Sequence, residues 1–125
     1  MIREATRARI SSLAAAFAAT SASAAAEGPQ TITGELISVW CYIQSPKNVG
    51  EAGYVCALAD LKWEGNPPGV LTASGVVYQL AGPALGENNA SVVPLIGRTV
   101  SATGEVIERD GVRILTASQL KAVAR

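Results

Sequence analysis

The sequence contains no histidine, and this absence removes several classes of chemistry. Imidazole is the usual general base near neutral pH and the commonest protein ligand of zinc and copper. Catalytic Ser-His-Asp and Cys-His arrangements and histidine-based metal sites are therefore excluded. Since no other group of side chains supplies an acid, a base and a nucleophile together, we predict a non-enzymatic protein without catalytic residues.

An excess of positive charge is also missing. The ten Lys and Arg residues are balanced by ten Asp and Glu residues, and charged residues make up only 16% of the chain. Nucleic acids and anionic membranes attract proteins that carry clustered positive charge. We therefore expect no nucleic-acid partner.

The first 26 residues have the layout of a secretory signal peptide. A basic start is followed by an uncharged stretch, from Ile10 to Ala26, which ends in three alanines before Glu27. This stretch is alanine-rich and shorter than the roughly 20 strongly apolar residues that span a bilayer, although a membrane anchor and an organellar transit peptide are alternatives. We predict a signal peptide over residues 1–26 that is cleaved after Ala26. The exported domain, residues 27–125, is then periplasmic or secreted, with no stable membrane insertion after cleavage.

The sequence has only two cysteines, Cys41 and Cys56, and both lie in the predicted exported domain. Two thiols in a small exported domain usually form a disulfide. Closing a loop of this size restricts the unfolded chain by roughly 3 kcal/mol. A structural disulfide without a cofactor is therefore the leading prediction.

Two other roles for the cysteines stay open. In the first, the protein is a periplasmic metal-handling accessory in which both thiolates bind a soft metal such as copper. Asp60 is the candidate third ligand, because it lies four residues after Cys56 on the same face of a predicted helix. In the second, the pair is a redox-active disulfide, although its spacing is unlike a C-x-x-C motif.

The first half of the exported domain is predicted to hold one strand and one helix. Residues Thr31–Tyr42 are rich in β-branched and aromatic side chains, which indicates a long strand. Its apolar alternation changes phase, so we expect a bend near Gly34–Ser38. A helix is expected from about Val49 to Glu64, with Asn48 and Glu51 in a capping-box pattern.

The second half is predicted to form two hairpins. Val70–Thr72 and Val76–Leu80 flank a glycine-containing turn, and Arg98–Glu108 and Val112–Ala117 flank Arg109-Asp110-Gly111. Ala81–Ser91 is expected to be a long surface loop. Five strands with one helix suit a mainly β fold, a small closed or nearly closed barrel that leaves few exposed sheet edges.

Three segments resemble a group of small exported bacterial OB-fold proteins of largely uncharacterised function. The segments are GELISVWCY, VCALADLKWEGNPPGVLTASGVVYQL and GRTVSATGEVIERDGVRILTASQL. The last contains the pattern G-[KR]-x-V-x-[AV]-T-G-x-V, which many OB-like barrels share. The resemblance implies a five-stranded OB-like barrel with one α-helix between strands 1 and 2, and a binding function.

The chain departs from that group at a cysteine cluster. The group carries a segment resembling H-x-x-C-x-x-x-C after the cysteine of the first strand. Here Gly53 stands in the place of the histidine and Asp60 in the place of the last cysteine. Only Cys41 and Cys56 match, which weakens a metal site and leaves an even pair of thiols.

The few aromatic residues define a candidate binding surface. OB folds often bind ligands through aromatics on the barrel face, although packing at the core and rim is the alternative. The partner would be a periplasmic protein or a small ligand, docking on Pro46–Tyr54 or Ala81–Ser91. The candidate surface residues are Trp40, Tyr42, Tyr54, Trp63 and Tyr78.

Overall fold

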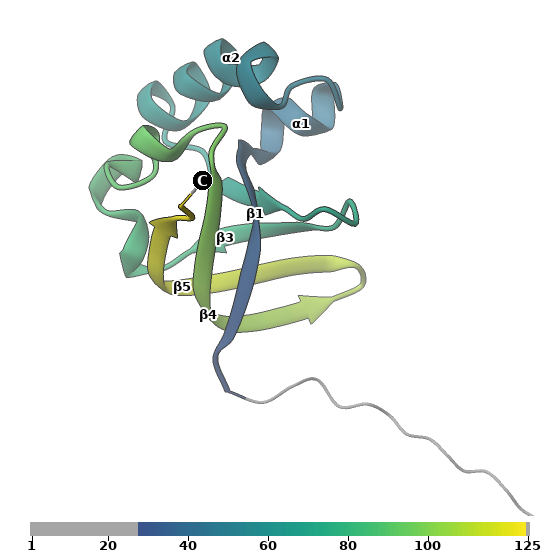
Figure 1. Cartoon of the computed structure of the whole chain (residues 1–125), viewed down its shortest axis with the longest axis vertical. Coiled ribbons are helices and arrows are strands. Elements are labelled where there is room, and N and C mark those ends of the chain that lie inside the picture. The colour runs from purple at the N-terminus through teal and green to yellow at the C-terminus, as the bar shows by residue number, and fades with distance from the viewer. Residues whose placement is uncertain (1–27, 125) are drawn as a thin grey trace, which may run out of the picture.

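The computed structural model describes residues 28–124, so the predicted signal peptide lies outside the described residues. Five strands close into a ring in the order β1-β2-β3-β5-β4 (Figure 1). The β3–β5 pair is parallel, and the other four pairs are antiparallel. The predicted mainly β class is confirmed. The strands are β1 (Gln30–Ser38), β2 (Pro68–Leu71), β3 (Val77–Ala81), β4 (Thr99–Arg109) and β5 (Val112–Ala122).

The first strand pairs with two other strands of the ring. β1 pairs with β4 from Gln30 to Glu35 and with β2 from Glu35 to Ser38, so it changes partner at Glu35. A Cβ atom at Gly34 would overlap the carbonyl of Leu71, so a glycine is required where the strands come this close. This change of partner falls within Gly34–Ser38, the segment where the bend is expected.

The first strand ends four residues earlier than predicted, and its last part is helical. α1 (Val39–Gln44) begins directly after Ser38, whose hydroxyl oxygen accepts a 3.0 Å hydrogen bond from the Cys41 backbone N–H. This N-cap stabilises the first turn of a helix. The high β propensity of Val39-Trp40-Cys41-Tyr42 is overridden, and Cys41 lies on a helix.

The prediction of a single helix between the first two strands is also wrong. Three consecutive helical pieces follow α1: η1 (Gly50–Gly53), α2 (Tyr54–Leu58) and η2 (Ala59–Trp63). The predicted capping by Asn48 is wrong, because the N-cap of η1 is Val49, without a side-chain hydrogen bond. The Asn48 amide instead donates a 2.7 Å hydrogen bond to the Cys41 carbonyl of α1. We refer to residues 39–63 as the helical layer; it covers one end of the ring (Figure 1).

Both predicted hairpins are present. β2 pairs with β3, and β4 pairs with β5 over almost their whole length. Asp110 and Gly111 have φ of +53° and +88°, the left-handed conformation that a two-residue hairpin turn requires at both positions. The fifth strand continues to Ala122, beyond the predicted end at Ala117, because Leu120 and Ala122 pair with the first half of β4.

The core is aliphatic and lies inside the ring. Strand residues supply most of it, Ala57 and Leu61 come from the helical layer, and Val92 and Ile96 precede β4. The segment between β3 and β4 contains the short turns η3 (Pro83–Leu85), η4 (Glu87–Asn89) and η5 (Val93–Leu95). Across residues 28–124, no helix is long and apolar enough to cross a membrane. The strand residues of the core are Leu36, Val70, Leu80, Val100, Ala102, Leu115 and Ala117.

Candidate functional site

The disulfide joins the two α-helices of the helical layer. Cys41 of α1 and Cys56 of α2 are bonded, with 6.1 Å between their Cα atoms, which confirms the predicted disulfide. Cys41 is buried and Cys56 is half-buried. Helices of six and five residues are not stable alone in water, so their mutual position depends on this bridge and on packing.

Asp60 is a buried carboxylate that connects the end of the helical layer to its beginning. Its Oδ2 accepts a 2.6 Å hydrogen bond from the Ser38 hydroxyl, and its Oδ1 accepts one of 2.6 Å from the Asn66 amide. Ser38 is the residue that caps α1. The carboxylate therefore holds the cap residue in place, a role that the sequence did not suggest.

The proposed copper ligands are engaged with other groups. Cys41 and Cys56 are joined to each other, and both oxygens of Asp60 accept hydrogen bonds. Among residues 28–124, no three His, Cys, Asp or Glu side chains are grouped so that they could hold a metal ion. Copper binding requires free thiolates, so this alternative stays a prediction for the reduced protein.

Asn89 connects the segment before β4 to the helical layer. Its side chain is buried and donates hydrogen bonds of 2.9 Å to the carbonyls of Leu61 and Asn66. Asn88 and Asn89 have φ of +51° and +61°, a conformation that asparagine tolerates better than most residues. Sequence reasoning treated this segment as a surface loop and missed the anchor; the adjacent asparagines were the available signal.

The predicted aromatic residues come from two parts of the fold. Trp40, Tyr54 and Trp63 are exposed on the helical layer, with exposed fractions of 55%, 43% and 72%. Tyr42 is half-buried on α1, and Tyr78 is half-buried on β3, opposite Val70 of β2. Four of the five residues therefore belong to the helical layer, while Tyr78 belongs to the wall of the ring.

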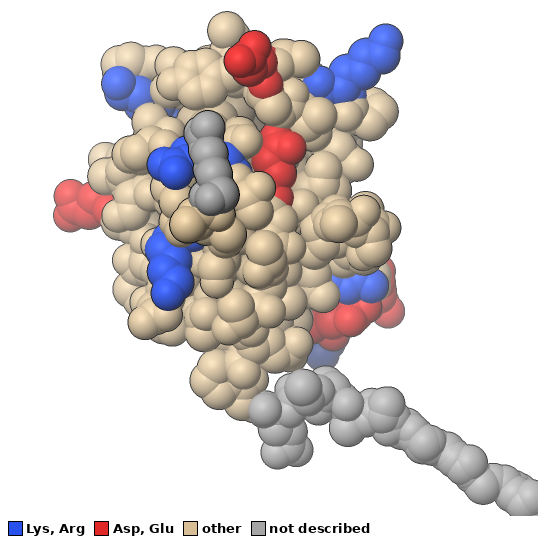
Figure 2. All heavy atoms as spheres, viewed as in Figure 1, with Lys and Arg blue, Asp and Glu red and all other residues tan. Residues whose placement is uncertain are grey.

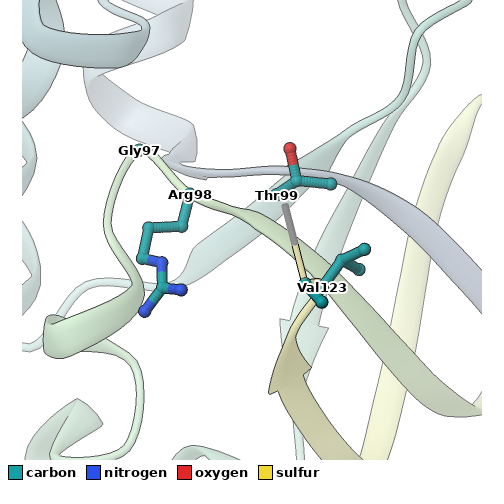
Figure 3. Close-up of a pocket in the computed structure, with 5 residues that line it drawn as sticks. Gly97, Arg98, Thr99 and Val123 are labelled. Carbon is teal, nitrogen blue, oxygen red and sulfur yellow. The ribbon is translucent and has the colours of Figure 1, made fainter.

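One hollow lies between the helical layer and the chain that enters β4. It has a volume of about 500 Å³, and Tyr54 and Val55 line one side of it. A second hollow of about 330 Å³ shares Gly97 and Arg98 with it and extends to Val123 (Figure 3). We call the two hollows together the Arg98 groove. The lining residues of the larger hollow are Gly50, Glu51, Tyr54, Val55, Ile96, Gly97 and Arg98.

A third hollow of about 370 Å³ lies at the other end of the helical layer, beside Trp63. The Lys62 ammonium lies 4.9 Å from the centre of the Trp63 ring, within the range of a cation–π interaction. Glu87, Asn88 and Ala90 form part of the opposite wall. Both segments predicted to dock a partner therefore contribute to a hollow, Pro46–Tyr54 to the Arg98 groove and Ala81–Ser91 to the Trp63 hollow.

Exposed apolar side chains are concentrated on the helical layer. Among residues 28–124, eight large hydrophobic residues are exposed, and five of them lie within residues 39–63: Trp40, Ile43, Tyr54, Val55 and Trp63. In Figure 2 positive and negative side chains are interspersed on the visible face and do not gather into a field of one sign. The helical layer is thus the part of the molecule best suited to recognition by apolar contact.

Comparison of the chain with protein-family models, with curated proteins and with solved structures gives no match.

Proposed function

We propose that the protein is an exported, non-enzymatic OB-like module that binds a periplasmic partner protein or a small ligand through its helical layer. The two short helices are joined by the disulfide and present exposed aromatic and aliphatic side chains to solvent. In the part of the chain that the structure describes, five of the eight exposed large hydrophobic residues lie on this one layer, and this concentration is the observation that carries the proposal.

The strand arrangement supports the OB-like assignment. β1 pairs with both β2 and β4, and five strands close into a ring, as expected for a small five-stranded Greek-key barrel. In OB folds the loop between strands 1 and 2 is one of the elements that contact ligands. Here that connection is the helical layer.

The proposed layer has the properties of a recognition surface. Val55 and Ile43 are 78% and 71% exposed, and Val55 also lines the Arg98 groove beside Tyr54. A partner that covers these exposed apolar groups removes them from water, which lowers the free energy of the complex. The disulfide and the buried Asp60 hold the helices in one arrangement, which lowers the entropy lost on binding.

Export and the state of the cysteines are tested by the intact mass of the protein recovered from the periplasm or the medium. The sample is purified without reductant and measured under native and denaturing conditions. We expect a chain that begins at Glu27, lacks two hydrogens and carries no metal. A chain with free thiols and bound copper would instead establish the metal-handling alternative.

Binding is tested by placing a photo-crosslinking amino acid at Val55 or Ile43 in the exporting cell. Gln119, which is exposed on β5, serves as the control position. We expect the same discrete adduct from both positions of the helical layer and none from Gln119. The substitution Ile43→Glu should abolish the adduct formed at Val55. Equal labelling at all three positions would contradict a recognition role for the layer.

A further inference from the structure

The outer half of the β4–β5 hairpin has an open edge. β1 covers the edge of β4 only as far as Gly104, which lies opposite Gln30 at the start of β1. Within residues 28–124, Glu105–Arg109 of β4 pair with β5 alone. Pro29 precedes β1 and has no N–H to continue the ladder. The hairpin accordingly extends past β1 in Figure 1.

This open edge carries an ordered set of side chains. Glu105, Ile107 and Arg109 alternate along β4, so their side chains lie on the same face of the strand, and all three are exposed. Ile107 pairs with Ile114, and Arg109 pairs with Val112. Ile107 and Val112 are 65% and 59% exposed, so an apolar strip lies beside one acidic and one basic group.

We propose that this edge binds the same edge of a second copy of the chain, antiparallel, about a two-fold axis through Ile107. In that register Ile107 lies opposite Ile107 of the second copy. Glu105 lies opposite Arg109 of the second copy, and the symmetry repeats this pairing. Cross-strand pairs of opposite charge stabilise a sheet, and an unpaired strand edge is a template for another strand.

Other two-fold registers are less favourable. An axis at Glu105, Glu108 or Arg109 places two like charges directly opposite each other, which destabilises an antiparallel pair. An axis at Val106 brings Glu108 of the second copy opposite Gly104, where β1 already lies. Glu108 itself pairs with Arg113 within the hairpin, at 3.4 Å. Only the axis at Ile107 uses every open position and joins opposite charges.

The test is sedimentation velocity of the oxidised exported domain over a range of protein concentrations. A five-residue edge is a small interface, so a weak dimer that forms as concentration rises is expected. Glu105→Arg or Arg109→Glu alone should weaken dimerisation by about tenfold, because each places two like-charged pairs across the axis. The double variant Glu105→Arg/Arg109→Glu should restore it.

Mixing the two single variants gives an independent check, because a heterodimer of them again joins opposite charges at both positions. Lys121→Glu is the matched control, since it changes the net charge as Arg109→Glu does but lies on β5 opposite Ser101. Lys121→Glu should leave dimerisation unchanged. A monomer at every concentration would overturn the proposal. So would a dimer that tolerates both single reversals, or one that the double variant fails to restore. The edge lies outside the helical layer, so this outcome is independent of the proposed binding function.

Discussion

The ring and the helical layer are stabilised in different ways. The ring buries aliphatic side chains from all five strands, and Leu36, Val70 and Leu115 are fully buried. The helical layer contributes two buried residues to that core, Ala57 and Leu61, and it is also held by one disulfide and by hydrogen bonds to buried polar groups. A segment held by a covalent bridge and polar contacts can leave apolar side chains exposed. The ring therefore maintains the fold, and the helical layer keeps the exposed apolar side chains on which the proposed partner recognition depends.

The largest loss of stability is expected from a substitution that creates a cavity inside the ring. Leu115→Ala should lower the free energy of unfolding by about 2–5 kcal/mol, because it removes a fully buried side chain and leaves a void. Urea unfolding followed by circular dichroism measures the change. Ile43→Ala, at a 71% exposed position of the helical layer, should cost no more than about 0.5 kcal/mol. Equal losses for the two variants would mean that the ring is not the stabilising part.

Removing the disulfide should affect the helical layer more than the ring. Cys41→Ala/Cys56→Ala should lower the free energy of unfolding by about 3 kcal/mol, because the unfolded chain regains the freedom of a closed loop of this size. Hydrogen exchange should rise most in α1 and α2 and least in β4 and β5, since local opening follows local stability. A uniform rise across both regions would show that the bridge stabilises the molecule as a whole.

A smaller loss of stability is expected when the side chain of the buried anchor Asn89, next to the Trp63 hollow, is removed. Asn89→Ala should cost about 1–3 kcal/mol, because the carbonyls of Leu61 and Asn66 lose their donor. Chemical unfolding gives the loss, and fluorescence quenching of Trp63 in a Trp40→Phe background reports the hollow. Asn88→Gly, at the adjacent exposed position, keeps the positive φ and is the control. If Asn89→Ala and Asn88→Gly lower the free energy of unfolding equally, Asn89 is not an anchor.

Sequence reasoning succeeded where the controlling residues are neighbours in the chain. The β4–β5 hairpin follows from Asp110-Gly111 and from the alternation of polar residues with small or apolar ones along β4, and both signals lie within a few positions. It failed at Val39–Tyr42, where strand-forming residues adopt a helix. The deciding contacts there are the cap by Ser38 and the hydrogen bond from Ser38 to Asp60, which is 22 positions away. Local propensity could not report that contact.

In the candidate site, too, some features follow from neighbouring residues and others only from contacts between distant segments. The sequence by itself determined the turns, the apolar alternation of β4 and the identity of the disulfide, since two cysteines allow one intramolecular pairing. Only the tertiary structure decided that Tyr78 belongs to the wall of the ring, that Asn89 is an anchor and that β4 ends in an open edge. The physical reason is distance along the chain: turns and alternation depend on adjacent residues, whereas these three features depend on contacts between separate elements.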